Sequence, residues 1–131
     1  MKLEKGCMAN NFKDAYFLRI AREVSTASKC LSRHVGAVIV KDGAIISTGY
    51  NGPPRGVTHC NDRSIEFYEA LDHSLPNIRP MAEDNVCPRK YMGYKSGQGL
   101  HLCCAGHAER NAIVQAARSG VSTKDSTLYC Y

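Results

Sequence analysis

The fold of this chain is decided by the stretch Val35-Gly36-Ala37-Val38-Ile39-Val40-Lys41-Asp42-Gly43-Ala44-Ile45-Ile46-Ser47-Thr48-Gly49-Tyr50. It consists of two runs rich in β-branched and other apolar residues, separated by the pair Asp42-Gly43. An Asp-Gly pair between two such runs predicts a β-hairpin. Because the first run is apolar on successive residues, we expect both faces of its sheet to be covered.

A helix is predicted before this stretch, because apolar residues recur at helical spacing from Phe12 to Ala27. We expect it to span about 12–28, with aromatic side chains such as Phe12 and Tyr16 packed in the core. Residues 1–10 read as a loose lead-in.

A second helix is predicted after Gly106, where small residues recur at helical spacing and suit close packing on a sheet. The triplet Arg118-Ser119-Gly120 is typical of a helix end, with glycine just beyond it. Residues 127–131 then predict a third strand. Alternating strands and helices of this kind indicate an α/β fold in a single domain, 1–131.

Composition narrows the classes of function. The net charge of +5 suits a phosphorylated substrate, but Lys and Arg are scattered, so we expect no nucleic-acid partner. The longest apolar run, Gly36–Val40, is too short for a membrane span, and the first residues lack a signal-peptide core. We therefore expect a cytoplasmic protein whose seven cysteines are thiols or metal ligands rather than disulfides.

Residues 57–104 form a predicted insertion with poor periodicity, and a loop region of this length needs something to hold it. A structural zinc ion with four Cys or His ligands would supply that order. Unpaired or buried thiols remain an equally weighted alternative. The candidate ligands in the insertion are His59, Cys60, Cys87, His101, Cys103 and Cys104.

Three further residues carry potential chemistry. His107 and Glu109 stand two residues apart at the predicted start of the second helix, which suits a zinc ligand beside a proton-transferring carboxylate. Taken alone this pattern is weak, because a single His at a helix start is more often structural. Asn51 follows the second hairpin strand, and by itself it reads first as a turn residue that tolerates positive φ.

Several stretches, in the same order along the chain, carry a more specific resemblance. The sequence resembles the deoxycytidylate deaminases of the zinc-dependent cytidine deaminase superfamily from about residue 12 to Tyr131. The residues that carry it are Ser28-Lys29-Cys30, Val35–Gly43, Ile45-Ile46-Ser47-Thr48-Gly49-Tyr50-Asn51-Gly52-Pro53-Pro54-Arg55-Gly56, His107-Ala108-Glu109-Arg110-Asn111-Ala112-Ile113 and Thr127-Leu128-Tyr129.

The resemblance implies a three-layer α/β/α fold with a mixed central sheet. It also implies that His107 binds the catalytic zinc and that Glu109 is the general acid/base. Asn51 would contact the sugar of the substrate, which reverses its first interpretation, and Ala108 would also contribute to substrate binding.

A second, structural zinc ion is also implied by the resemblance. Its expected ligands are Cys30, Cys60, Cys87 and His101. Cys103 and Cys104 compete with them for a place in this site.

The implied activity is the zinc-dependent hydrolytic deamination of dCMP to dUMP and ammonia in dTMP and pyrimidine nucleotide biosynthesis. A homo-oligomer, often a hexamer, and allosteric control by dCTP (with Mg²⁺) and dTTP are also implied, with no membrane partner. Two alternatives stay open: a nucleic-acid deaminase of the same superfamily acting on tRNA or single-stranded DNA, and a non-catalytic nucleotide-binding homologue.

The family pattern continues beyond the strand at 127–131 into Pro-Cys-x-x-Cys, whose thiolates complete the zinc site, whereas this sequence ends at Tyr131. We therefore expect the fold as given to be C-terminally incomplete, with three strands and an open edge on the last one. The catalytic zinc would need ligands beyond Tyr131. A substitute site of Cys104, His107 and Cys130 is a minor alternative.

Overall fold

The computed structural model describes residues 1–5, 12–60, 62 and 87–131 of the chain, and for residues 2–5 the backbone alone. The chain divides into two compact units. Unit 1 comprises residues 1–28, 34–51 and 106–131, and unit 2 comprises residues 29–33 and 52–105. The expected insertion at 57–104 falls in unit 2, where residues 61 and 63–86 lie outside the described residues.

Unit 1 is built on a four-stranded sheet in the order β1-β4-β2-β3. The strands are β1 (Lys2–Lys5), β2 (Gly36–Lys41), β3 (Ala44–Tyr50) and β4 (Thr127–Cys130). Strand β2 is antiparallel to both β3 and β4, whereas β1 runs parallel to β4, so the sheet is mixed, as predicted.

The predicted hairpin is confirmed as β2 and β3. Its turn residues Asp42 and Gly43 have φ of 50° and 77°. Both therefore lie in the left-handed region, which a two-residue hairpin turn requires at its two central positions.

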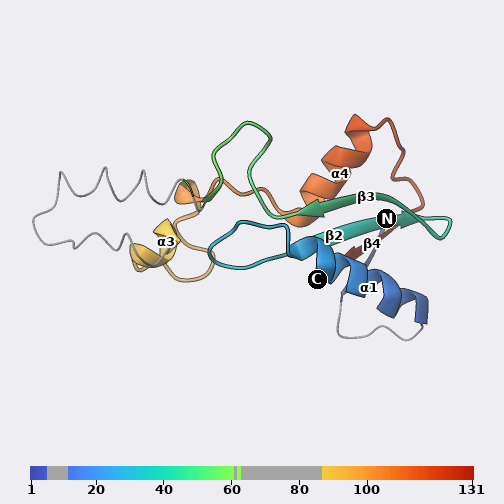
Figure 1. Cartoon of the computed structure of the whole chain (residues 1–131), viewed down its shortest axis with the longest axis horizontal. Coiled ribbons are helices and arrows are strands. Elements are labelled where there is room, and N and C mark those ends of the chain that lie inside the picture. The colour runs from blue at the N-terminus through green and yellow to red at the C-terminus, as the bar shows by residue number, and fades with distance from the viewer. Residues whose placement is uncertain (6–11, 61, 63–86) are drawn as a thin grey trace, which may run out of the picture. The chain divides into compact units, whose positions relative to one another are not determined.

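Two helices cover the two faces of this sheet (Figure 1), so the predicted three-layer α/β/α fold is confirmed. Helix α1 (Phe12–Ser25) lies on one face and helix α4 (Ala108–Arg118) on the other. Strand β2 serves both, because Val38 and Val40 face α1 while Ala37 and Ile39 face α4. The unbroken apolar run of β2 follows from this double burial.

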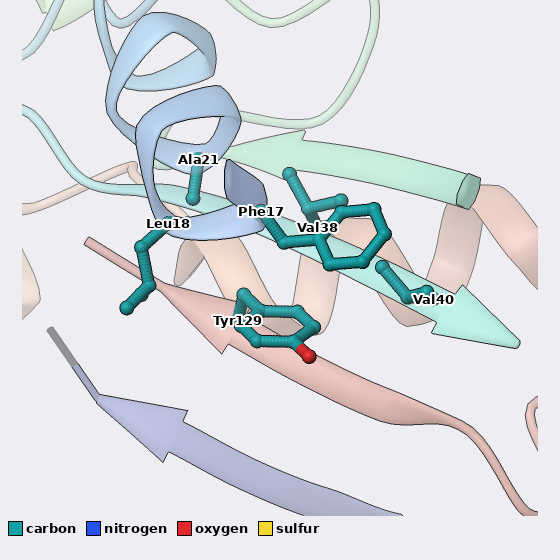
Figure 2. Packing of buried hydrophobic residues seen from close by; sticks show 6 residues of the cluster. All are labelled: Phe17, Leu18, Ala21, Val38, Val40 and Tyr129. Atoms are coloured by element: carbon teal, nitrogen blue, oxygen red, sulfur yellow. The ribbon is translucent and has the colours of Figure 1, made fainter. Parts of the chain in front are cut away.

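The core beneath α1 is an interlocked group of side chains, shown in Figure 2. The rings of Phe17 and Tyr129 pack with centroids 5.1 Å apart. The prediction that the other aromatic residues of α1 are buried was wrong, since Phe12 is 80% exposed and Tyr16 is 46% exposed. The helix presents the adjacent stripe to the sheet, through Phe17, Leu18, Ala21 and Ser25.

Two positions of the sheet require glycine because a helix backbone approaches them closely. A Cβ atom on Gly36 would meet the Ala21 carbonyl oxygen and the Ser25 backbone nitrogen, the latter at 2.6 Å. A Cβ atom on Gly49 would strike the backbone of Ala108 and Ala112 in α4. Three members of the predicted small-residue stripe of α4, Ala108, Ala112 and Ala116, are fully buried and permit this approach. The prediction was wrong for its other two members, Ile113 and Ala117, which are exposed.

The outer edge of β4 differs from expectation. The sequence predicted three strands, with this edge open, but the backbone of Lys2–Lys5 pairs with it in parallel register, from Lys2 opposite Thr127 to Lys5 opposite Cys130. An unpaired edge offers backbone donors and acceptors to any extended segment, so a strand can form there without an apolar pattern of its own. The prediction of a loose lead-in was therefore wrong for these four residues.

Unit 2 contains little regular structure in its described part: α3 (Pro88–Tyr91), the 3-10 helix η1 (Leu100–Leu102) and connecting turns. Within the described residues of unit 2, the buried apolar side chains are Cys87 and Pro88. Gly99 has φ of 64°, and the ring of Tyr94 occupies the space that a Cβ atom would take there. None of the helices in the described ranges is both long and apolar enough to cross a membrane.

Candidate functional site

His107 and Glu109 lie at the start of α4, as the sequence predicted. His107 is the residue before the first helical turn, with extended backbone angles, and its carbonyl accepts a hydrogen bond from the Asn111 N–H at 3.0 Å. Its imidazole is exposed and makes no capping hydrogen bond within the described residues. Glu109 follows in the first turn, where the helix dipole favours a carboxylate.

Both side chains line a cavity of about 570 Å³ in unit 1. The cavity combines an imidazole, a carboxylate and a guanidinium with apolar walls, which is the usual make-up of a site for a small molecule. Its lining residues are Met1, His107, Glu109, Arg110, Ile113, Val114 and Leu128.

Cys130 forms a hydrogen bond with Glu109. Its Sγ–H donates to the Glu109 Oε1 atom at 3.5 Å. Cys130 reaches α4 because it lies two residues beyond Leu128, on the same face of β4. The sequence had placed Cys130 only in the minor three-ligand alternative, although the two-residue alternation along the predicted strand already put it on the face of α4.

Asn51 is held rigidly at the end of β3. Its backbone N–H donates to the Val35 carbonyl at 3.1 Å, and its Oδ1 accepts from the Val35 N–H at 2.8 Å. The Ser28 hydroxyl donates to its carbonyl at 2.8 Å, and the residue is 8% exposed. In the described ranges, positive φ at non-glycine residues occurs at Asp42 and Asp125 alone, so the first interpretation of Asn51 as a positive-φ turn residue was wrong.

Two residues that the sequence analysis missed attach α4 to β3. The Asn111 side-chain amide donates to the Tyr50 carbonyl at 2.8 Å, and the buried Ser47 hydroxyl donates to the Ala112 carbonyl at 2.8 Å. These bonds hold the first turns of α4 beside the strand end that carries Asn51. Polar residues at these positions gave no recognisable signal, because their partners are backbone carbonyls distant in sequence.

Ala108 is fully buried, and its methyl group packs in the cluster between α4 and the sheet. Its side chain is therefore part of the core. Any contact of Ala108 with a ligand has to come from its backbone, whose N–H lies in the first turn of α4, where such groups lack an intrahelical acceptor.

The donor set for a catalytic zinc ion is incomplete in the described part of the chain. His107 fits as one ligand, because its imidazole is exposed on the cavity that Glu109 also lines. Among the described residues, no three His, Cys, Asp or Glu side chains already stand close enough together to hold a metal ion. A catalytic zinc therefore needs further ligands than these residues provide.

Four of the five cysteines of unit 2 interact with one another electrostatically. Burial raises the pKa of the Cys60 thiol to about 11, the Leu31 N–H donates to its sulfur and opposes that rise, and the thiols of Cys87, Cys30 and Cys104 are near enough to add to it. Cys30 and Cys87, two of the residues expected at the structural zinc, thus lie within electrostatic range of Cys60. Among the described residues, however, no three potential ligands stand close enough together to hold a metal ion.

The fourth expected ligand, His101, has a different environment. It is exposed, and its ring packs edge-on against Tyr94 with centroids 6.0 Å apart. Among the described residues it is not one of the groups that act electrostatically on Cys60.

Comparison with known proteins gives a consistent result. Residues 12–131 match the sequence model of the cytidine and deoxycytidylate deaminase zinc-binding region. The deoxycytidylate deaminase of Schizosaccharomyces pombe is 34% identical over 134 aligned positions, covering 98% of this chain and 34% of that protein. That of Enterobacteria phage T4 is 38% identical, covering 89% of this chain and 65% of that protein.

Solved structures agree with the sequence matches. The crystal structure of the dCMP deaminase of cyanophage S-TIM5 in complex with dCMP and dUMP is similar, with a TM-score of 0.57 and 30% sequence identity. The match covers 94% of this chain and 66% of that one. The chain thus spans about a third of the length of the yeast relative and about two thirds of the phage proteins.

Proposed function

This chain belongs to the cytidine and deoxycytidylate deaminase family, and from that premise we propose that it catalyses the hydrolytic deamination of dCMP to dUMP and ammonia. The observation that carries the proposal is the placement of His107 and Glu109. The pair begins α4 and lines one cavity, and it lies in a chain whose relatives include enzymes named deoxycytidylate deaminase. The reaction would serve dTMP and pyrimidine nucleotide biosynthesis.

Glu109 is the proposed proton carrier. The oxygen of a water molecule forms a bond to C4 of the pyrimidine, and the bond from C4 to its amino nitrogen breaks. Glu109 takes one proton of that water and delivers it to ring N3, and then passes the second to the departing amine, so that dUMP and ammonia leave. The Cys130 S–H bond to Oε1 restricts the orientation of the carboxylate before substrate binds.

Zinc, when bound, supplies the activation of the water at neutral pH. His107 is the described residue that fits as its ligand, and the proposed activity requires further ligands. Asn51 and the backbone of Ala108 are proposed to contact the nucleotide. Their support is positional: Asn51 directly follows β3, and the Asn111 amide ties α4 to Tyr50, the last residue of that strand.

A structural metal ion in unit 2, held by Cys30, Cys60 and Cys87 with a fourth ligand, is part of the same proposal. Assembly into a homo-oligomer, with a hexamer as the expected form, and control by dCTP with Mg²⁺ and by dTTP are also proposed, on family resemblance alone. Light scattering with and without each nucleotide tests the oligomer, and the dCMP dependence of the rate tests the control.

The decisive test is Glu109→Gln, which keeps the shape of the side chain but cannot accept a proton. We expect bound zinc to be unchanged and dCMP turnover to fall by about two to four orders of magnitude. Turnover at the wild-type rate would contradict the role of Glu109. Parallel assays with free dCMP and a single-stranded oligonucleotide separate nucleotide from nucleic-acid deamination, and activity on the polymer alone would overturn the proposed substrate.

A non-catalytic nucleotide-binding homologue is the alternative that the sequence leaves open. Calorimetric titration with dCMP together with an ammonia assay distinguishes the two functions. Binding without ammonia release from the wild-type chain would favour the second.

A further inference from the structure

The start of α4 is tied to the sheet on two opposite flanks. Residues two apart on a helix lie about 200° apart around its axis, so Glu109 and Asn111 project from opposite flanks of α4. The Asn111 amide donates to the carbonyl of Tyr50 on β3. The Glu109 carboxylate meets Cys130 on β4, which β2 separates from β3. The two bonds therefore hold the helix start from both sides.

The position of Cys130 follows from the packing of β4. Cys130 comes two residues after Leu128, so both side chains point to the face of the sheet that α4 covers. Leu128 is buried in one cluster with Ala108 and Ala112, which fixes β4 against the helix. This packing carries Cys130 Sγ to within 3.5 Å of Glu109 Oε1.

The thiol is the donor of this hydrogen bond. An ionised carboxylate, the form that can take up a proton, has lone pairs and no proton to give, so Oε1 accepts from the Cys130 S–H. In the described ranges, Cys130 is the residue that donates a hydrogen bond to Glu109. A glutamate side chain has several rotatable bonds, and without such a bond the half-buried carboxylate would sample several rotamers.

We propose that Cys130 is a positioning residue for Glu109: its thiol holds Oε1, and the other carboxylate oxygen, Oε2, carries the proton. This inference rests on the proposed deamination and assigns its proton transfers to one atom. Oε2 takes one proton of the attacking water and gives it to ring N3. It then carries the second proton to the departing amine, which leaves the carboxylate ionised again. The order matters because a misplacement of about 1 Å can cost about 100-fold in rate.

The first test observes the bond between Cys130 and Glu109 without turnover. The S–H stretching band of a cysteine moves to lower wavenumber as the thiol donates a stronger hydrogen bond. Infrared difference spectra of the full 131-residue chain, wild type minus Cys130→Ser, isolate the Cys130 band. In the Glu109→Gln background the acceptor is neutral and the bond weaker, so this band should move to higher wavenumber. The band of the exposed Cys103, isolated with Cys103→Ser, is the matched control and should not move.

The second test separates the donor from the space that the side chain fills. Cys130→Ala is smaller than the thiol and Cys130→Val is larger, and neither can donate. Both should lower kcat for dCMP by about three- to tenfold, the range of one hydrogen bond. KM should stay unchanged, because Cys130 acts through Glu109 and not on the nucleotide. Cys130→Ser keeps a donor and should restore most of the lost kcat.

The outcomes that contradict the proposal are distinct from those that contradict the activity. A Cys130 band that stays in place in Glu109→Gln would overturn the positioning role whatever the turnover. A Cys130→Ser chain as slow as Cys130→Ala would overturn it as well, because packing and not the donor would then matter. If the wild-type chain turns over no dCMP while the band moves as expected, the proposed deamination is refuted and the hold of Cys130 on Glu109 stands.

Discussion

Unit 1 and unit 2 belong to one chain but are stabilised by different means. Unit 1 buries apolar side chains on both faces of a sheet, with two glycines where the helices approach most closely. The described part of unit 2 has turns, cysteines that form no disulfide with one another, and two buried apolar side chains. The comparison teaches that one chain can use two sources of stability, a buried apolar core in one unit and, as proposed, metal coordination in the other. The cavity of unit 1 places a few polar side chains on a sheet and helix that are already packed, whereas unit 2 is proposed to be held by a metal ion bound to its thiols.

The largest difference between the units is expected on metal removal. If zinc holds unit 2 at a free concentration 1,000 times its Kd, chelation should raise the opening equilibrium of that unit about a thousandfold. Hydrogen exchange of the amides around α3 and η1 should accelerate accordingly, while the amides of β2 stay protected. The Cys60→Ser chain, which lacks one proposed ligand, is the control and should show no further change on chelation. If amide exchange accelerated equally in both units, the proposal that metal stabilises unit 2 alone would be wrong.

Glycine substitutions compare a position where the backbone packs closely, in unit 1, with a position that has open space around it, in unit 2. Gly49→Ala places a methyl group against the backbone of α4, which cannot rotate away, and should lower the free energy of unfolding by about 3 kcal/mol. In unit 2, Gly56 has φ of 80° and a Cβ atom there meets nothing within 4 Å. Gly56→Ala should therefore cost only the left-handed conformation, about 1 kcal/mol. Denaturant titration followed by circular dichroism measures both, and equal losses would contradict the packing argument.

Two tyrosines compare a hydroxyl that is hydrogen-bonded in the core of unit 1 with one on an exposed side chain of unit 2. The Tyr129 hydroxyl donates to Asp14 Oδ1 at 2.7 Å beneath α1. Tyr129→Phe should lower the free energy of unfolding by about 1.5 kcal/mol, as for a hydrogen bond to a charged group. Tyr94→Phe in unit 2 alters an exposed side chain and should change it by less than about 0.5 kcal/mol. Thermal unfolding of both variants measures the difference, and a larger effect at Tyr94 would reverse the comparison.

The smallest effect is expected from exposed amide contacts. Asn111→Ala removes the bond from α4 to the Tyr50 carbonyl and should cost about 0.5–1 kcal/mol, with faster exchange in the first turn of α4. Gln98→Ala in unit 2 removes the acceptor of the Lys95 N–H at 3.2 Å and should leave α4 unchanged. If Asn111→Ala also raises KM for dCMP while Gln98→Ala does not, the attachment of α4 contributes to the cavity. Identical exchange in α4 for both variants would remove Asn111 from this role.

Much of unit 1 was predictable because its signals are local. The Asp42-Gly43 pair predicts a tight turn, and the unbroken apolar run of β2 predicts that both faces of the sheet are covered. The structure contains both the turn and the two covering helices. Prediction failed at Phe12 and Tyr16, where periodicity marks a broad apolar face of α1 but not the part that meets the sheet. It also failed at β1, since pairing at an edge depends on backbone groups that every residue carries.

By itself, the sequence determined the hairpin, the two covering helices and the pair His107 and Glu109, because turn geometry and helical spacing depend on residues close together in the chain. Tertiary structure alone decided which polar side chains support that pair, through Asn111 on α4, Ser47 on β3 and Cys130 on β4. It also brought the thiol of Cys104 within electrostatic range of Cys60, from a segment distant in sequence. The physical reason is that contacts between distant segments depend on how whole helices and strands pack, which the spacing of residues along the chain does not predict.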